Sequence, residues 1–150
     1  MVHGSISSQI SDDIGELSTT LLSNVQDLIV AHGPKHPPIC FRCNSPSQRK
    51  RTRHLNRNGN AGRPYDKCTN CGNFLGFADE RGNTPNNPLC YCGQSSKSQV
   101  TGQNSGNPGG WHYVCRLGTC NYYAVRMNRN NKQIRLSGDM VEEFASLKLV

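Results

Sequence analysis

Apolar residues recur every three or four positions over residues 8–32. The stripe consists of Ile10, Ile14, Leu17, Leu21, Val25 and Leu28. This spacing places the apolar side chains on one face of a helix. Asp13 and Glu16 have the spacing of a capping box, and Gly33-Pro34 ends the pattern. The sequence therefore predicts an N-terminal amphipathic helix and a Pro-rich spacer over residues 1–38.

Two interpretations of this helix stay open. Its apolar face either packs on the rest of the chain, or it binds a protein partner or a second copy of the chain through residues 8–32. A weaker helical pattern lies in the tail, residues 128–150. There Asp139 and Glu142 have capping-box spacing, and a short apolar face follows at Met140, Val141, Phe144 and Leu147. We expect a short C-terminal helix.

The rest of the chain is too polar for a large core. Only 34% of the 150 residues are hydrophobic, and 15 Gly and 8 Pro interrupt the pattern. Small domains with thin cores need disulfides or a metal. Eight cysteines can supply them, because they form two sets with spacings C-x2-C-x24-C-x2-C and C-x1-C-x22-C-x4-C. The sets are Cys40, Cys43, Cys68 and Cys71, then Cys90, Cys92, Cys115 and Cys120.

Paired cysteines in a reducing compartment are typical metal ligands. The N-terminus has no signal-peptide pattern, and no apolar run approaches the length of a membrane span, so we expect an intracellular chain. We predict two structural Zn²⁺ ions per chain. A disulfide framework and a cross-braced arrangement, in which the two sets share ligands, are the alternatives.

A repeat extends beyond the cysteines. Asn60 and Asn107 both lie eight residues before the third cysteine of their set, and Gly62 and Gly109 lie six before it. Asn and Gly at this spacing predict a tight turn that leads into a ligand-bearing strand. Aromatic residues follow the last cysteine of each set, and we expect them to form a small core. They are Phe74, Phe77, Tyr122 and Tyr123.

The segment N-x-G-R-x-(aromatic)-x-x-C, followed by an aromatic end segment, resembles the GRF-type zinc finger family. Residues 60–68, N-A-G-R-P-Y-D-K-C, match the pattern, and residues 74–80 resemble the end segment with one residue inserted. The second copy keeps the cysteines but has Gly110 in place of the Arg and His112 in place of the aromatic residue. We interpret the chain as two tandem copies, the second degenerate, with a packing or partner-contact role for His112.

The resemblance implies two small, β-rich, zinc-stabilised modules, each a three-stranded antiparallel sheet. We predict finger 1 over residues 39–81, a linker over 82–88, and finger 2 over 89–127. Within finger 2, the Ser/Gln/Gly/Asn-rich residues 94–110 are expected to form an exposed loop. The family also implies binding of single-stranded nucleic acid in a basic groove.

Charge supports a polyanion partner for finger 1. Residues 40–67 hold eight basic residues and one acid, Asp66, so this segment carries the full net charge of +7. The basic segment, residues 48–57, lies between the two ligand pairs of the first set. Three interpretations of this segment stay open: it contacts phosphate, it is a nuclear-localisation signal, or it is merely a solvated loop. The resemblance implies that Arg63 contacts nucleic acid. The alternative is that Arg63 braces the turn through a hydrogen bond. The candidate nucleic-acid contacts are Arg49, Lys50, Arg51, Arg53, Arg57, Arg63, Lys67 and Tyr65.

No catalytic motif stands out, and no small-molecule substrate or membrane partner is indicated. The sequence predicts a non-enzymatic, nuclear, tandem zinc-finger protein that binds single-stranded DNA or RNA through finger 1. The alternative is a cytoplasmic or nuclear adaptor or effector whose fingers and N-terminal helix bind a protein.

Overall fold

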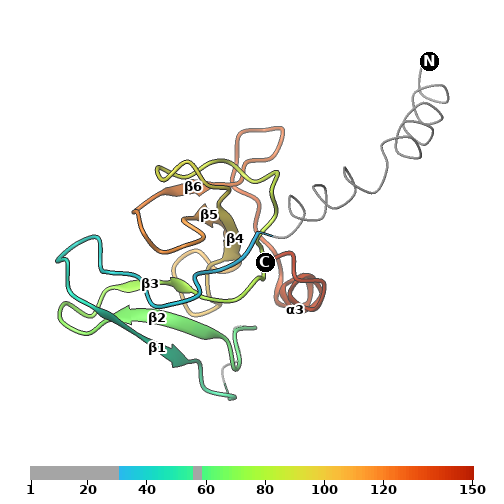
Figure 1. Cartoon of the computed structure of the whole chain (residues 1–150). Helices are drawn as coiled ribbons and strands as arrows, with labels where there is room; N and C mark the ends of the chain where they lie inside the picture. The colour runs from blue at the N-terminus through green and yellow to red at the C-terminus, as the bar shows by residue number, and fades with distance from the viewer. Residues whose placement is uncertain (1–30, 56–58) are drawn as a thin grey trace, which may run out of the picture. The chain divides into compact units, whose positions relative to one another are not determined.

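The computed structural model describes residues 31–55 and 59–150 (Figure 1). The predicted amphipathic helix over 8–32 lies outside the described residues except for its last two positions, and Arg57 lies outside them too. The described chain forms two three-stranded antiparallel sheets. This is the predicted fold class.

The first sheet follows the first cysteine pair. It consists of β1 (Ser47–Arg51), β2 (Pro64–Cys68) and β3 (Phe74–Phe77), in the order β1-β2-β3. Its register pairs Lys50 with Tyr65, and a bulge lies between Asp66 and Lys67. Because β2 ends at Cys68, the sheet positions a predicted metal ligand directly.

The second sheet repeats this arrangement with β4 (Lys97–Val100), β5 (Trp111–Val114) and β6 (Tyr123–Val125). The predicted exposed loop over residues 94–110 is therefore wrong in part, because it contains β4. Ser96, Lys97 and Ser98 are buried despite their polarity. Composition alone predicts an exposed loop, whereas an ion pair with Asp79 holds Lys97 in place.

The predicted Asn-Gly turns are confirmed and are equivalent in detail. The amide of Arg63 donates to the carbonyl of Asn60 over 3.1 Å, and the amide of Gly110 donates to that of Asn107 over 3.2 Å. Gly62 and Gly109 both have a φ of 72°, a left-handed conformation that favours glycine.

Each turn is bonded to an equivalent threonine, which the alignment on cysteines does not reveal. Thr52 and Thr101 each follow the first strand of their sheet. Both exchange main-chain hydrogen bonds with the turn, and both hydroxyls donate to a turn carbonyl, that of Arg63 or of Gly110. The connection from Thr to Asn is two residues longer in the first copy, so alignment on cysteines does not bring the threonines together.

The cores differ from the predicted aromatic mini-cores. In the first module, Cys40, Cys68 and Leu75 are buried together, while Phe74 is 45% exposed. In the second, Trp111 packs with Leu136, Val141 and Val150, and Tyr123 is 55% exposed. The metal-ligating sulfurs and residues of the tail replace the predicted aromatic cluster.

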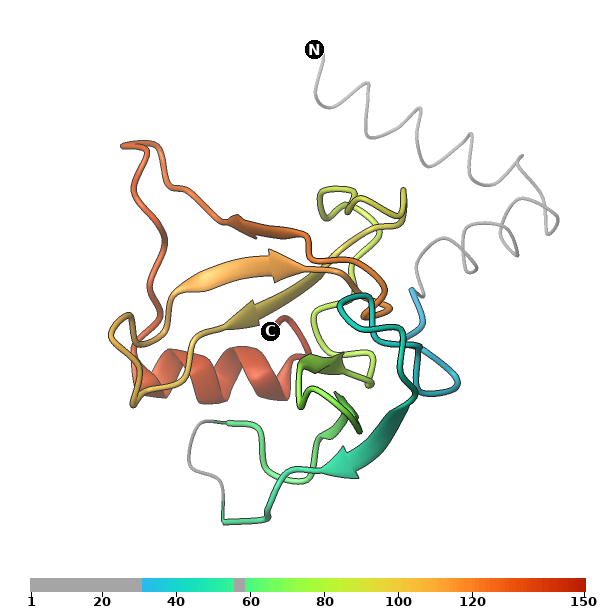
Figure 2. The same ribbon diagram turned by 90° about the vertical axis from the view of Figure 1, so that its left-hand side faces the viewer.

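The tail contributes α3 (Gly138–Ser146), as predicted, but with a different cap. The Ser137 hydroxyl accepts from the amide of Met140, so Asp139 lies in the first turn rather than at the cap. Figure 2 shows α3 (red) alongside the second sheet. There Phe144 meets the Trp111 ring edge-on with centroids 5.6 Å apart, whereas Met140 and Leu147 remain exposed.

The predicted linker, residues 82–88, is packed against the second module. The amide of Ser98 donates to the carbonyl of Gly82 over 2.8 Å, and the Asn87 side chain donates to the carbonyls of Gly82 and Ser96. A Cβ at Gly82 would lie 2.0 Å from the Ser98 carbonyl oxygen, so only glycine fits there. These residues therefore form part of the join between the modules.

The join is centred on Asp79. Its carboxylate accepts two hydrogen bonds from Arg63, at 2.7 and 2.9 Å, and one from the Lys97 ammonium at 2.9 Å. Lys97 is fully buried and also donates to the Asp79 carbonyl and to Asn83. Burial lowers the pKa of Lys97 to about 8, although Asp79 opposes that shift. One carboxylate thus pairs with two buried cations, and the three side chains together keep a net positive charge.

We expect Asp79→Asn to destabilise the zinc-loaded protein strongly. Removing one partner of a buried ion pair leaves uncompensated charge and costs about 3–5 kcal/mol. Lys97→Met should cost clearly less, because Asp79 keeps Arg63 as its partner. Urea unfolding measures both, with exposed Glu142→Gln as a control that stays near wild type. Equal stability of Asp79→Asn and the control would show that Asp79 does not hold the modules together.

Candidate metal centres and basic face

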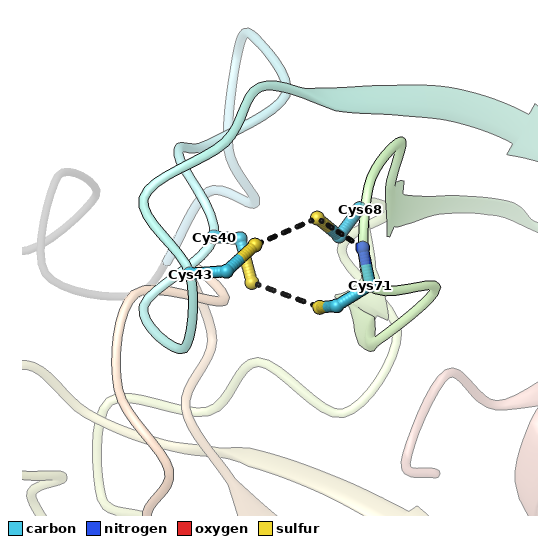
Figure 3. A group of neighbouring side chains, drawn as sticks. All are labelled: Cys40, Cys43, Cys68 and Cys71. Carbon is cyan, nitrogen blue, oxygen red and sulfur yellow. Dashed lines mark hydrogen bonds between the residues drawn. The ribbon is translucent and has the colours of Figure 1, made fainter.

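The first cysteine set converges on one point. Cys40 and Cys43 come from the loop before β1, while Cys68 ends β2 and Cys71 lies in the turn that follows it. Figure 3 shows the four sulfurs facing one another. The Sγ atoms of Cys40 and Cys71 are 3.7 Å apart, and those of Cys43 and Cys68 are 3.4 Å apart.

The second set forms an equivalent cluster. Cys90 and Cys115 bring their Sγ atoms to 3.8 Å, and all four sulfurs of Cys90, Cys92, Cys115 and Cys120 lie within 4.8 Å of one another. The Thr119 hydroxyl lies 3.0 Å from the Cys92 sulfur, and its amide donates to Cys115. Each cluster draws on its own set, so the arrangement is tandem and the cross-braced alternative does not occur.

The geometry fits zinc. A tetrahedral ion with Zn–S bonds of about 2.3 Å places its sulfurs roughly 3.8 Å apart. All eight cysteines are free, so the disulfide alternative does not hold in this structure. Main-chain amides of Arg42, Asn70 and Cys71 donate to sulfur in the first cluster, as they would to a ligand thiolate. With four thiolates, the coordination of each ion is closed and leaves no position for water.

Each cluster contains a thiol that ionises easily. Hydrogen bonds from Ser45 and Asn70 lower the pKa of Cys43 to about 5. Burial opposes ionisation of Cys115, but hydrogen bonds from Thr119 and from main-chain amides outweigh it and lower its pKa to about 6. Close thiolates repel one another, so a divalent cation is needed before all four can ionise together.

Comparison with protein families identifies the first module. Residues 37–81 match the model of the GRF-like zinc ribbon domain. This segment is therefore similar to a GRF-like zinc ribbon. The match confirms the resemblance seen at residues 60–68, and the two four-cysteine clusters are consistent with tandem zinc-binding modules. Searches of curated proteins and of solved structures return no match.

Histidine takes no part in either cluster among the described residues. His112 is buried, and its ring stacks on that of Tyr123 with centroids 4.9 Å apart. Its Nδ1 lies 3.0 Å from the Gly110 carbonyl oxygen. Of the two roles predicted for His112, packing and partner contact, the structure shows packing.

One face of the ribbon's sheet combines cations with aromatic rings. Directly paired residues share a face, so Lys50, Tyr65 and Phe77 lie together, as do Gln48, Lys67 and Phe74. Lys50 and Lys67 are exposed. The rings form a continuous group, with Tyr65 and Phe74 centroids 5.7 Å apart and those of Phe74 and Phe77 5.1 Å apart. We call these six residues the basic face.

Two further predicted contacts lie on the edge beside the basic face. Arg51 and Arg53 are exposed and line a shallow hollow together with Leu55 and Tyr65. The Arg51 guanidinium also donates to the Gly62 carbonyl over 3.0 Å. Arg53 is thus the more available cation of the two. Phe74 belongs to the same surface, whereas its place after the last cysteine of the first set predicts a core position.

Arg49 and Arg63 occupy different surroundings from the other predicted contacts. Arg49 makes two hydrogen bonds to the buried Asp66, at 2.8 and 3.0 Å, and also donates to the carbonyls of Pro34 and Lys35. It therefore holds the spacer against the sheet.

Arg63 is only 5% exposed. Its guanidinium donates to Asp79 and to the Asn60 side chain, and it lies 3.9 Å from the centre of the Phe77 ring. This geometry favours the bracing role over the contact role. The carboxylate that pairs with Arg63 lies sixteen residues further along the chain, so the motif alone does not reveal it.

The second module replaces this arginine for a reason that the structure makes visible. A Cβ at Gly110 would lie 2.4 Å from the side-chain nitrogen Nδ2 of Asn107 and 2.9 Å from the side-chain nitrogen Nε2 of Gln133. Asn107 donates to Gln133 over 2.9 Å, and Gln133 donates to the carbonyl of Trp111 over 3.0 Å. The tail therefore braces this turn in place of an arginine.

None of the described helices is long and apolar enough to cross a membrane.

Metal analysis of the purified chain should return two zinc ions per protein molecule. Cys71→Ser should retain one, because the second cluster has its own four ligands, and Cys92→Ser should likewise retain one. Native mass spectrometry measures both. Loss of both ions from either single variant would show that the two centres are not independent.

Proposed function

We propose that this chain is a non-enzymatic zinc protein that binds single-stranded nucleic acid through the basic face of the GRF-like ribbon. One observation carries the proposal, namely that Lys50 and Lys67 lie on the same sheet face as the connected rings of Tyr65 and Phe74. Cations follow a phosphate backbone, while exposed aromatic rings stack on unpaired bases. A duplex keeps its bases stacked inside, so the rings favour a single strand.

The metal centres support a structural role for zinc in this proposal. Closed four-thiolate coordination holds the sheet in place and leaves no site for a reacting water. The ribbon would then present a rigid surface rather than a reactive one. A nuclear location belongs with the proposal, with the cytoplasm as the alternative.

The refined contact set is smaller than the sequence indicated. Lys50, Arg53 and Lys67 provide exposed charge, and Tyr65 and Phe74 provide ring surface. Arg49 and Arg63 support this surface from within by fixing the spacer and the turn. Losing either would disturb binding through the fold rather than through a lost phosphate contact.

The main test compares Lys50→Ala/Arg53→Ala/Lys67→Ala with Arg129→Ala/Lys132→Ala/Arg135→Ala. Both triple variants remove three exposed cations, so their net charge is equal. Fluorescence anisotropy with labelled single-stranded DNA and RNA should show a steep salt dependence for the wild type. Each lost phosphate contact lowers the slope of log affinity against log salt by about 0.7, so the first variant should lose roughly 2.

The control variant should bind nearly as the wild type does. Equal weakening by both triple variants would mean that only the overall charge matters, and the basic face would not be the site. Absence of binding by the wild type would reject the proposal itself.

The alternative, a protein-binding adaptor, is favoured by a separate groove in the second module. This groove of about 610 Å³ is lined by Trp111, Tyr113, Phe144 and Leu149, and the Trp111 indole nitrogen is buried without a hydrogen-bond partner in the described part of the chain. Apolar and aromatic walls are typical of peptide-binding grooves. Failure of every oligonucleotide to bind would turn attention to this surface.

A further inference from the structure

A second groove lies where the ribbon meets the second metal centre. It has a volume of about 460 Å³ and is lined from the ribbon by Arg42, Asn73 and Phe74, and from the second module by Gln99, Tyr122 and Tyr123. Its volume is in the range of ordinary ligand sites. Residues from both modules are needed to form it.

Close packing fixes the two sides of this groove. The turn at Gly118, between Cys115 and Cys120, lies against β3. A Cβ at Gly118 would be 2.8 Å from the Leu75 carbonyl oxygen, and one at Gly76 would be 4.0 Å from the Cys115 carbonyl oxygen. The metal-binding turn of the second module thus rests directly on the ribbon.

The groove continues from the basic face through one residue. Phe74 is on the basic face, where its ring contacts Tyr65, and it also lines the groove. On the other side, Tyr123 is 55% exposed and its ring is backed by His112. A nucleic-acid strand that lies over Lys50 and Lys67 can therefore extend past Phe74 to a second aromatic surface, that of Tyr123.

Two amides that line the groove have unused hydrogen-bonding atoms. Among the described residues, Asn73 Nδ2 and Gln99 Oε1 are buried without a partner. The orientation of Gln99 follows from His112. Nδ1–H of His112 donates to the Gly110 carbonyl, so its Nε2 accepts from Gln99 Nε2, and Oε1 is left free. A donor and an acceptor beside aromatic walls match the edge of a nucleobase.

We infer that the second module takes part in nucleic-acid binding by holding one unstacked base in this groove. The base stacks on Tyr123, its edge faces the amides of Asn73 and Gln99, and the exposed Arg42 at the groove takes the adjacent phosphate. This inference rests on the proposed function of the basic face. It gives the second module a contact role although it lacks the signature arginine.

The test uses the full chain and two lengths of labelled single-stranded oligonucleotide, about four and about twelve nucleotides. Tyr123→Ala should weaken binding of the longer one by about fivefold or more, since one base–aromatic stack is lost. Binding of the shorter one, which fits on the basic face alone, should be unchanged. Tyr123→Phe keeps the ring and should bind as the wild type does.

The two proposals fail differently. Wild-type affinity of Tyr123→Ala at both lengths, with loss of binding in the Lys50/Arg53/Lys67 variant, would overturn the groove and leave the basic face standing. Unchanged binding in that triple variant would overturn the proposed function, and the groove proposal with it.

A second measurement covers the case in which Tyr123→Ala loses its zinc or its fold. The wild type is photo-crosslinked to an oligonucleotide that carries 5-iodouracil. Mass mapping should place crosslinks in residues 120–123 as well as on Tyr65 or Phe74. Crosslinks confined to residues 48–67 and Phe74, with none on Asn73 or in residues 120–123, would overturn the inference.

Discussion

Thiolate coordination is the constraint on which the rest of this structure depends. In the ribbon, the ligands Cys40 and Cys68 are also the buried core, and Leu75 is the main aliphatic side chain beside them. A core this small cannot offset the conformational entropy of folding the chain. The ion must therefore supply folding free energy, and the sheet exists because its ends are fixed to one point. The surface residues are then free to be charged and aromatic.

Asp79 imposes a second constraint, on the relation of the two modules. Its carboxylate satisfies Arg63 from the ribbon and Lys97 from β4, so neither cation is buried alone. Three charged groups in one partly buried network fix the relative position of the two modules more precisely than apolar contact would, because each hydrogen bond has a preferred direction. This sharpness matters for any groove that is shared between modules, since its walls must keep their spacing.

The sequence was most informative where chemistry demands a fixed residue type at a fixed spacing. The eight cysteines and the turns at Gly62 and Gly109 could be predicted because sulfur ligation and positive φ tolerate few substitutes. Strand β4 could not, because Lys97 is buried by pairing with a distant acid, which no local pattern shows. The environment of Arg63 was hidden for the same reason. The exposure of Phe74 and Tyr123 could not be predicted, because aromatic residues in small modules usually form the core. Here the cysteine sulfurs and residues of the tail form the cores instead.

The replacement of arginine by Gly110 has a consequence for the autonomy of the second repeat. The ribbon completes its turn with its own side chains, because Arg63 donates to Asn60 and to Asp79, and all three lie within residues 37–81. The second repeat obtains its brace from Gln133, and Leu136 closes against Gly109 from beyond the cysteine-bearing segment. The smallest segment that can fold as the second repeat is therefore longer than its four-cysteine pattern. Moving the cysteine pattern alone into another protein would provide the metal ligands but leave the turn without its support.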